Sequence, residues 1–181
     1  MNWTLRQSED LQTELWLRAA AVGRFVLPLD LSGAAADAVT MALANLEFLR
    51  ANKEHGWTLP PAHVFVNTNT GDFRAWEIAR LTEALEATVH IGQYCISAGL
   101  IVAVAGKHRV CRPDTKFGWH GSTAKPGHDP SHKDDEARAV YMAERTKVSA
   151  PLWLVYAQSG NLLEFGAEEA LDWGVVDEVG P

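Results

Sequence analysis

The stretch GQYCISAGLIVAVAG, residues 92–106, constrains the fold more than any other part of the chain. Its first half is a short strand-like apolar run, and its second half is apolar all round, which is typical of a buried helix. Ser97 stands at the junction and is followed at once by Ala-Gly. A hydroxyl in this place is either a helix cap or a nucleophile at the mouth of the helix. This stretch alone leaves both alternatives open.

Strand-like and helical segments alternate on both sides of this stretch. HVFV (63–66) and TVHI (88–91) are apolar, β-branched runs, typical of strands covered on both faces. Helices are predicted over residues 35–49 and 73–87, and a long helix over 134–158, kinked at Pro151. The alternation predicts one α/β domain with a mainly parallel sheet and a protruding long helix, over residues 23–181. Residues 1–22 form an N-terminal segment that is compatible with a helix.

Composition excludes several classes of function. The 181 residues suffice for one domain, and the net charge of -7 argues against a nucleic-acid partner. Two cysteines do not make a disulfide framework or a zinc motif. No signal peptide and no apolar run of about 18 residues is found, so we expect a cytoplasmic protein without a membrane span. We expect no cofactor and no metal, because His128 and His132 flank a proline in a loop without a third ligand.

Three residues at strand ends could carry chemistry together. Ser97 needs an imidazole to take its proton, and His120 ends the strand-like run KFGWH (116–120). Gly71, in the turn NTNTGD, could bring a backbone N–H close to a substrate. Parallel strands that end at one sheet edge would bring these residues together. Each also has a structural interpretation, as a cap, a hydrogen-bonded histidine or a turn glycine.

Two other features have simple structural interpretations. Cys95 could be a thiol nucleophile, but its apolar surroundings favour an inert buried cysteine. The charged run KDDEAR, residues 133–138, is interpreted as the solvated first turn of a helix, where acidic side chains complement the helix dipole.

At these residues the sequence resembles the Clp protease proteolytic subunit family, within the Clp/crotonase superfamily. The resemblance covers about Gly23 to Val179 and includes HVFVNTNTGDFRAWEIARLTEAL, VHIGQYCISAGLIVAVAG, KFGWHG and AEEALDWGVVDEV. It implies a ββα-repeat fold and a homo-oligomeric ring that cuts unfolded polypeptide inside. The helix around 134–158 would be the handle that joins two rings. A separate ATPase feeds members of the family, but no docking loop for one can be mapped.

The resemblance also implies roles for individual residues. Ser97 would be the nucleophile and His120 the general base. The backbone N–H groups of Gly71 and Ala98 would form the oxyanion hole.

Three departures from the family pattern stand out. The stretch between Gly92-Gln93 and the serine is one residue longer than in the family, so a gapless match would put Ile96 at the nucleophile position. We favour Ser97, with a one-residue bulge before it. Thr70 replaces one glycine of the family's Gly-Gly turn. The segment that should carry the third catalytic residue is about ten residues short and contains no aspartate. Asn161 and Glu164 are the candidates that remain to orient His120.

Three functions follow from these observations. The first is a serine hydrolase, a peptidase that acts by acyl transfer. The second is a non-catalytic Clp-like subunit with a structural or regulatory role, suggested by the missing aspartate. The third is a crotonase-type acyl-CoA enzyme, for which the chain is short. Labelling by a fluorophosphonate separates the first two, and coenzyme A binding would indicate the third.

Overall fold

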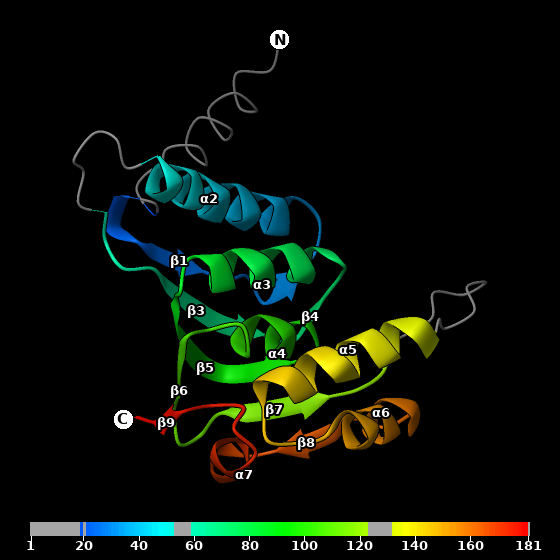
Figure 1. The fold of residues 1–181 in the computed structure, drawn as a ribbon. Helices are drawn as coiled ribbons and strands as arrows, with labels where there is room; N and C mark the ends of the chain where they lie inside the picture. The colour runs from blue at the N-terminus through cyan, green and yellow to red at the C-terminus, as the bar shows by residue number, and fades with distance from the viewer. Residues whose placement is uncertain (1–18, 20, 53–58, 123–131, 181) are drawn as a thin grey trace.

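The computed structural model describes residues 19, 21–52, 59–122 and 132–180. These residues form a mixed α/β fold around a seven-stranded sheet with the order β1-β3-β5-β6-β9, in which β7 pairs with β5 and with β8 (Figure 1). Every pair in the sheet is parallel except β7–β8. The predicted fold class is therefore confirmed. Most of the N-terminal segment 1–22 lies outside the described residues.

Strands and helices alternate along the chain as the sequence predicts. The strands of the sheet are β1 (Arg24–Val26), β3 (His63–Thr68), β5 (Thr88–Ile96), β6 (His108–Cys111), β7 (Lys116–Trp119), β8 (Leu163–Phe165) and β9 (Glu178–Val179). A separate parallel pair consists of β2 (Asp30–Leu31) and β4 (Thr70–Gly71). The helices are α2 (Gly33–Ala51), α3 (Arg74–Ala84), α4 (Ala98–Ala103), α5 (His132–Arg145), α6 (Ala150–Gln158) and α7 (Ala167–Asp172).

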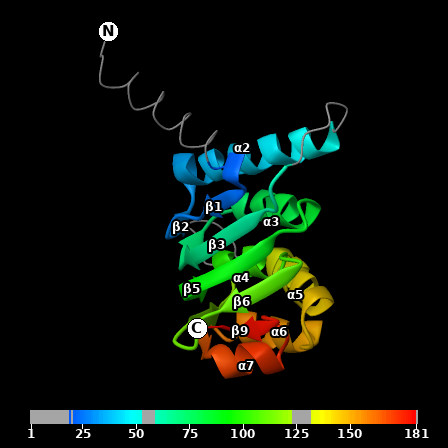
Figure 2. The same ribbon diagram turned by 90° about the vertical axis from the view of Figure 1, so that its left-hand side faces the viewer.

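One face of the sheet is buried more deeply than the other. In β3, Val64 and Val66 are fully buried, whereas His63 and Phe65 are half-buried. The sequence-based expectation that both faces are covered was therefore wrong. The alternation of more and less buried residues along β3 is not visible in the sequence, because the half-buried positions also carry large or apolar side chains. Figure 2 shows that β1, β3, β5 and β6 are rotated progressively relative to one another, which is the usual twist of a sheet.

Strand β5 divides its length between two neighbours. Thr88–Ile91 pair with β6, and Tyr94–Ile96 pair with β7. The register against β3 shifts at the change of neighbour, where Val66 faces Ile91 but Thr68 faces Cys95. The Asn67 side chain occupies this irregularity and accepts a hydrogen bond from the Tyr94 backbone N–H at 2.9 Å. A bulge of one residue was expected just before Ser97, whereas β5 has two extra residues at this irregularity, because it advances four residues from Ile91 to Cys95 while β3 advances two.

The predicted long helix is two helices. Helix α5 ends at Arg145 and α6 begins at Ala150, so the kink expected at Pro151 is a complete break. Pro151 lies in the first turn of α6, where its missing N–H costs no helical hydrogen bond. Trp153 of α6 and Trp119 of β7 are fully buried, and the indole Nε1 of Trp119 donates to the Trp153 carbonyl at 2.9 Å. This contact seats the helix pair against the end of β7.

Candidate active site

Ser97 occupies a sharp turn between β5 and α4. Its φ of 55° lies in the left-handed region, which a serine rarely adopts and which costs on the order of 1–3 kcal/mol. The turn is held on both sides, because the Ser97 N–H donates to the Gly118 carbonyl at 2.9 Å and the Ser97 carbonyl accepts from Leu100 at 3.0 Å. Ile96, the alternative in a gapless match, is the last residue of the strand. Strain held at one residue by its surroundings is a feature of functional sites.

Gly71 and the start of α4 are in close contact. A Cβ atom placed on Gly71 would lie 2.6 Å from the Cβ of Ala98 and 2.8 Å from that of Leu31. Only glycine fits there, and the reason is space, since its φ is not in the left-handed region. Ala98 is the first residue of α4, where a backbone N–H has no intrahelical acceptor. The turn before α3 and the serine turn are thereby brought side by side.

His120 follows directly after β7. Because Gly118 is the register partner of Ile96, the residues after β5 and after β7 emerge at the same edge of the sheet. The His120 Nδ1 lies 2.6 Å from the Gly121 carbonyl oxygen. A carbonyl oxygen only accepts, so Nδ1 carries the proton in this contact. A neutral ring then presents an unprotonated Nε2, which is the form a general base needs.

One cavity of about 420 Å³ is lined by Ser97, Ala98, Gly71 and His120 together. The structure thus brings the four residues singled out by the sequence to one surface. No hydrogen bond joins the Ser97 and His120 side chains. Contacts of this kind are often longer before a substrate binds. The wall also contains the apolar groups of Phe73, Trp76 and Ile101, and the charged residues Asp72, Asp134 and Arg138.

Asn161 and Glu164 do not contact His120. The Asn161 amide donates to the Ser159 carbonyl at 3.4 Å, and Glu164 lies on β8 as the register partner of Gly118. Neither residue lines the cavity. Among the described residues, the group that contacts Nδ1 of His120 is the backbone carbonyl of Gly121. The sequence alone gives no sign of such a contact.

The charged run that begins α5 was misinterpreted at two positions. Asp135 is 5% exposed and Arg138 is 9% exposed, so the two are not solvated. Their side chains form an ion pair at 3.3 Å, and burial lowers the pKa of Arg138 while Asp135 opposes that shift. The spacing of three residues between an acid and a base was visible in the sequence, but not which face of the helix would be covered.

The remaining candidates carry little chemistry. Cys95 is fully buried, and burial raises the pKa of its thiol far above the usual range. A thiol in this state is a poor nucleophile. Within the described ranges, no three His, Cys, Asp or Glu side chains are grouped to hold a metal ion. His128 lies outside those ranges. None of the helices that the structure describes has the length and apolarity needed to cross a bilayer.

The fold of the chain is similar to that of solved structures. ClpP1 from Listeria monocytogenes superposes with a TM-score of 0.70 and 19% sequence identity, over 94% of this chain and 95% of that chain. A mutant of the same protein superposes with a TM-score of 0.72 at the same identity and coverage. No family model matches the sequence, and neither does any curated protein. The chain therefore has a Clp protease-like fold.

Proposed function

We propose, with the Clp protease-like fold as the premise, that the chain is a serine hydrolase of the peptidase type. The observation that carries this proposal is the convergence of Ser97, in its strained turn, and His120 on one cavity. The two residues are far apart in the sequence, and a structural cap or a structural histidine would not need to face a common cavity. The Gly121 contact that leaves Nε2 of His120 free to accept a proton supports the same assignment.

The reaction would be acyl transfer in two stages. Ser97 Oγ attacks the carbonyl carbon of a peptide bond while Nε2 of His120 takes the hydroxyl proton. The oxyanion is received by the N–H groups of Gly71 and Ala98, which the close contact of these two residues holds near each other. The imidazolium then gives its proton to the leaving amine. A water molecule, deprotonated by His120, releases the acyl group and restores Ser97.

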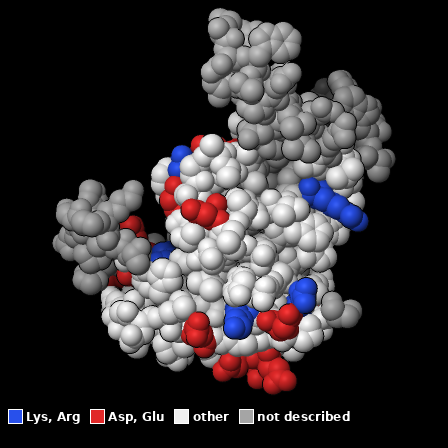
Figure 3. Space-filling model, turned by 180° about the vertical axis from the view of Figure 1, so that it is seen from behind, with Lys and Arg blue, Asp and Glu red and all other residues white. Residues whose placement is uncertain are grey.

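A self-compartmentalising homo-oligomeric ring is the proposed assembly, with polypeptide as the substrate. Large apolar side chains are exposed on five of the helices that the structure describes. Figure 3 shows, in addition, a broad area without charged side chains on the back of the molecule. The exposed helix residues are Met41 and Phe48 on α2, Trp76 on α3, Val140 on α5, Leu152 and Val155 on α6, and Leu171 on α7. Burial between subunits would remove them from water. Sedimentation that shows a stable monomer at micromolar concentration would rule this assembly out.

A non-catalytic subunit is the second candidate. It is favoured by two observations on the described residues: the side chains of Ser97 and His120 form no hydrogen bond, and no acidic side chain contacts His120. Such a subunit would keep the fold and the assembly while the serine stays unreactive.

A fluorophosphonate probe tests the proposal. We expect the wild-type chain to be labelled at Ser97, and the Ser97→Ala and His120→Gln variants to remain unlabelled. The Cys95→Ala variant is the control for the neighbouring nucleophile and should be labelled like the wild type. A folded wild-type protein that the probe does not modify would decide for the non-catalytic subunit.

A further inference from the structure

We propose that the buried Asp135–Arg138 ion pair is a positioning device for His120. It fixes residues 119–122 so that the Gly121 carbonyl accepts the Nδ1 proton of the imidazole. In a Ser-His-Asp triad, an acidic side chain accepts the hydrogen bond from Nδ1–H of the histidine. The inference rests on the proposed function for its catalytic meaning, but the state of the imidazole can be measured without any catalysis.

The ion pair holds the backbone on both sides of Gly121. Arg138 Nη2 donates to the His120 carbonyl at 3.0 Å. Asp135 Oδ1 accepts from the Ser122 backbone N–H at 2.7 Å and from Arg138 Nη1 at 3.3 Å. A weaker contact of 3.4 Å joins Arg138 Nη1 to the Ser122 hydroxyl. The two peptide groups that flank Gly121 are thus anchored to one helix, α5.

Packing leaves the Gly121 carbonyl little freedom. A Cβ atom at Gly121 would lie 2.4 Å from the Ala157 carbonyl oxygen and 3.0 Å from Asp135 Oδ2, so helix α6 also presses on this residue. The Arg138 guanidinium lies over the Trp119 ring, 4.5 Å from its centroid. Since the chain is fixed before and after Gly121, the direction of its carbonyl is fixed as well.

The direction of that carbonyl decides which ring nitrogen carries the proton. With Nδ1–H donating to Gly121, Nε2 of the neutral ring is an acceptor that can take the Ser97 proton. With the proton on Nε2, the ring could not act as the base. The charged groups near this segment are Asp135 and Arg138 themselves, together with Asp134 and Asp72 on the cavity wall.

Stability alone is a weak reason for such a pair. A buried ion pair can often be replaced by apolar side chains without loss of stability. Stability therefore does not explain why this chain has charged side chains at these two positions. Here its hydrogen bonds reach the backbone of the candidate base and of the residue two positions later. This geometry is what positioning requires.

An apolar replacement of the whole pair tests the proposal in the full-length chain. The Asp135→Leu/Arg138→Met double variant should fold, because no unpaired charge is left inside. We expect its Ser97 labelling rate to fall about 100-fold, the usual effect of a misplaced catalytic group. Nitrogen NMR of labelled histidine, assigned with His120→Gln, should show the His120 proton moving from Nδ1 to Nε2.

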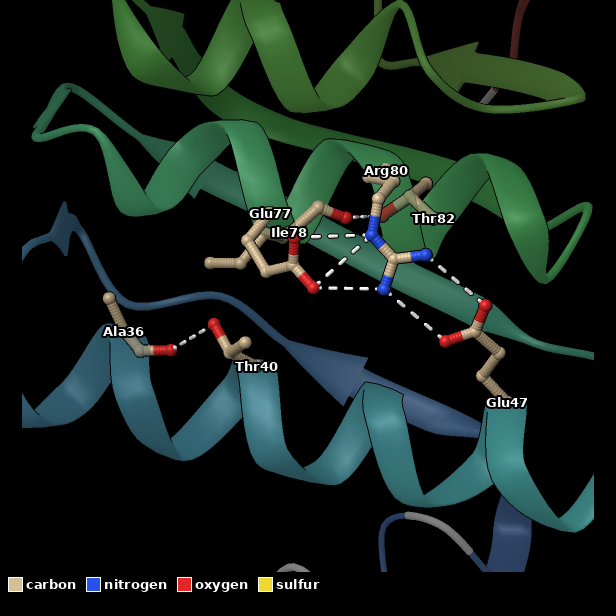
Figure 4. A network of polar contacts seen from close by, with 7 residues as sticks. All are labelled: Ala36, Thr40, Glu47, Glu77, Ile78, Arg80 and Thr82. Atoms are coloured by element: carbon tan, nitrogen blue, oxygen red, sulfur yellow. Dashed lines mark hydrogen bonds and ion pairs between the residues drawn. The ribbon is translucent and has the colours of Figure 1, made fainter.

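The pair Glu77–Arg80 provides the matched control. It has the same spacing on helix α3, but it is exposed and pairs with Glu47, as Figure 4 shows, and it does not line the cavity. The Glu77→Gln/Arg80→Met variant should leave both the labelling rate and the His120 tautomer unchanged.

The outcomes separate this inference from the proposed function. A wild-type chain that the probe does not label refutes the hydrolase, while the histidine spectrum still decides the positioning role. A folded double variant that keeps the Nδ1–H tautomer overturns the positioning role, whatever the labelling shows. If the double variant does not fold, Arg138→Lys decides: it keeps the charge but loses the forked contact, and an unchanged tautomer and labelling rate in it would refute the inference.

Discussion

Gly71 and Ala98 pack so closely that a Cβ atom on Gly71 would lie 2.6 Å from the Cβ of Ala98. A Gly71→Ala substitution must therefore push the two turns apart. We expect a stability loss of about 1–3 kcal/mol from the overpacking. We also expect Ser97 labelling to fall about 100-fold, because the two proposed oxyanion donors would separate. Chemical denaturation and probe kinetics on the same samples measure both effects.

Gly166→Ala is the control for that substitution. Nothing lies within 4 Å of a Cβ atom at Gly166, and its φ is not in the left-handed region. Labelling should stay at the wild-type level, and the stability loss should not exceed about 1 kcal/mol, which is the cost of alanine at the N-cap of α7. Equal labelling by Gly71→Ala and wild type would refute the role given to Gly71.

Trp153 holds the helix α6 against the sheet. It is fully buried, its ring packs edge-on against Trp119 at 5.3 Å and against Trp173 at 6.1 Å, and its Nε1 donates to the Thr146 hydroxyl at 3.1 Å. Trp153→Ala should lower the free energy of unfolding by about 3–5 kcal/mol. Thermal unfolding measures the effect. Val155→Ala, two positions on and 61% exposed in the protomer, should change it by less than about 0.5 kcal/mol.

Tyr141 should limit stability at alkaline pH. Its hydroxyl is buried and has no hydrogen-bond partner among the described residues, and burial raises its pKa to about 12 from the ordinary value of 10.0. The fold favours the neutral phenol over the ionised one. The contribution of the neutral phenol to the free energy of unfolding is therefore complete below pH 10 and is lost as the pH rises toward 12.

Tyr141→Phe should remove that part of the alkaline decline. At pH 7 the substitution should leave the stability unchanged or raise it by about 1 kcal/mol, because it removes a buried hydroxyl that has no hydrogen-bond partner among the described residues. The Arg145 guanidinium, 3.8 Å from the ring centroid, can still lie over a phenylalanine. Urea denaturation at pH 7 and pH 10.5 makes the comparison. A steeper decline in the variant than in the wild type would contradict the assignment.

Cys95 should be unreactive in the folded protein. Its thiol is buried and its pKa is raised, so the neutral form is favoured by the fold. This stabilisation is present below the thiol's unfolded pKa and is lost as the pH rises beyond it. Ellman's reagent should modify Cys95 only after denaturation. Rapid modification of native protein, absent in Cys95→Ala, would show that the strand end opens.

Much of the fold follows from the order of elements in the sequence. Apolar strand-like runs alternating with helices predict the parallel sheet, and the strand-to-helix junctions at Ser97 and Gly71 follow from local composition. The meeting of Ser97 and His120 at one cavity was expected because parallel strands end at a common edge.

What the sequence did not predict depends on contacts between distant elements. The break between α5 and α6 was expected as a kink, because Pro151 alone does not show whether it interrupts a helix or begins one. Asp135 and Arg138 have the spacing of a solvated acid-base pair, and the sequence does not show that they are buried against the Trp119 ring and the backbone of residues 120–122. The acceptor for His120 is a backbone atom, for which no residue type is a signal.

The change of neighbour along β5 takes up two extra residues. Between the paired positions on either side of it, β5 advances four residues, from Ile91 to Cys95, while β3 advances two, from Val66 to Thr68. Because the difference is even, Ile91 and Cys95 both face the core. Since alternate residues of a strand face opposite ways, deleting one residue between 92 and 94 would exchange the faces of all later residues of β5, whereas deleting two would keep them. We therefore expect this strand to accept changes of length in steps of two.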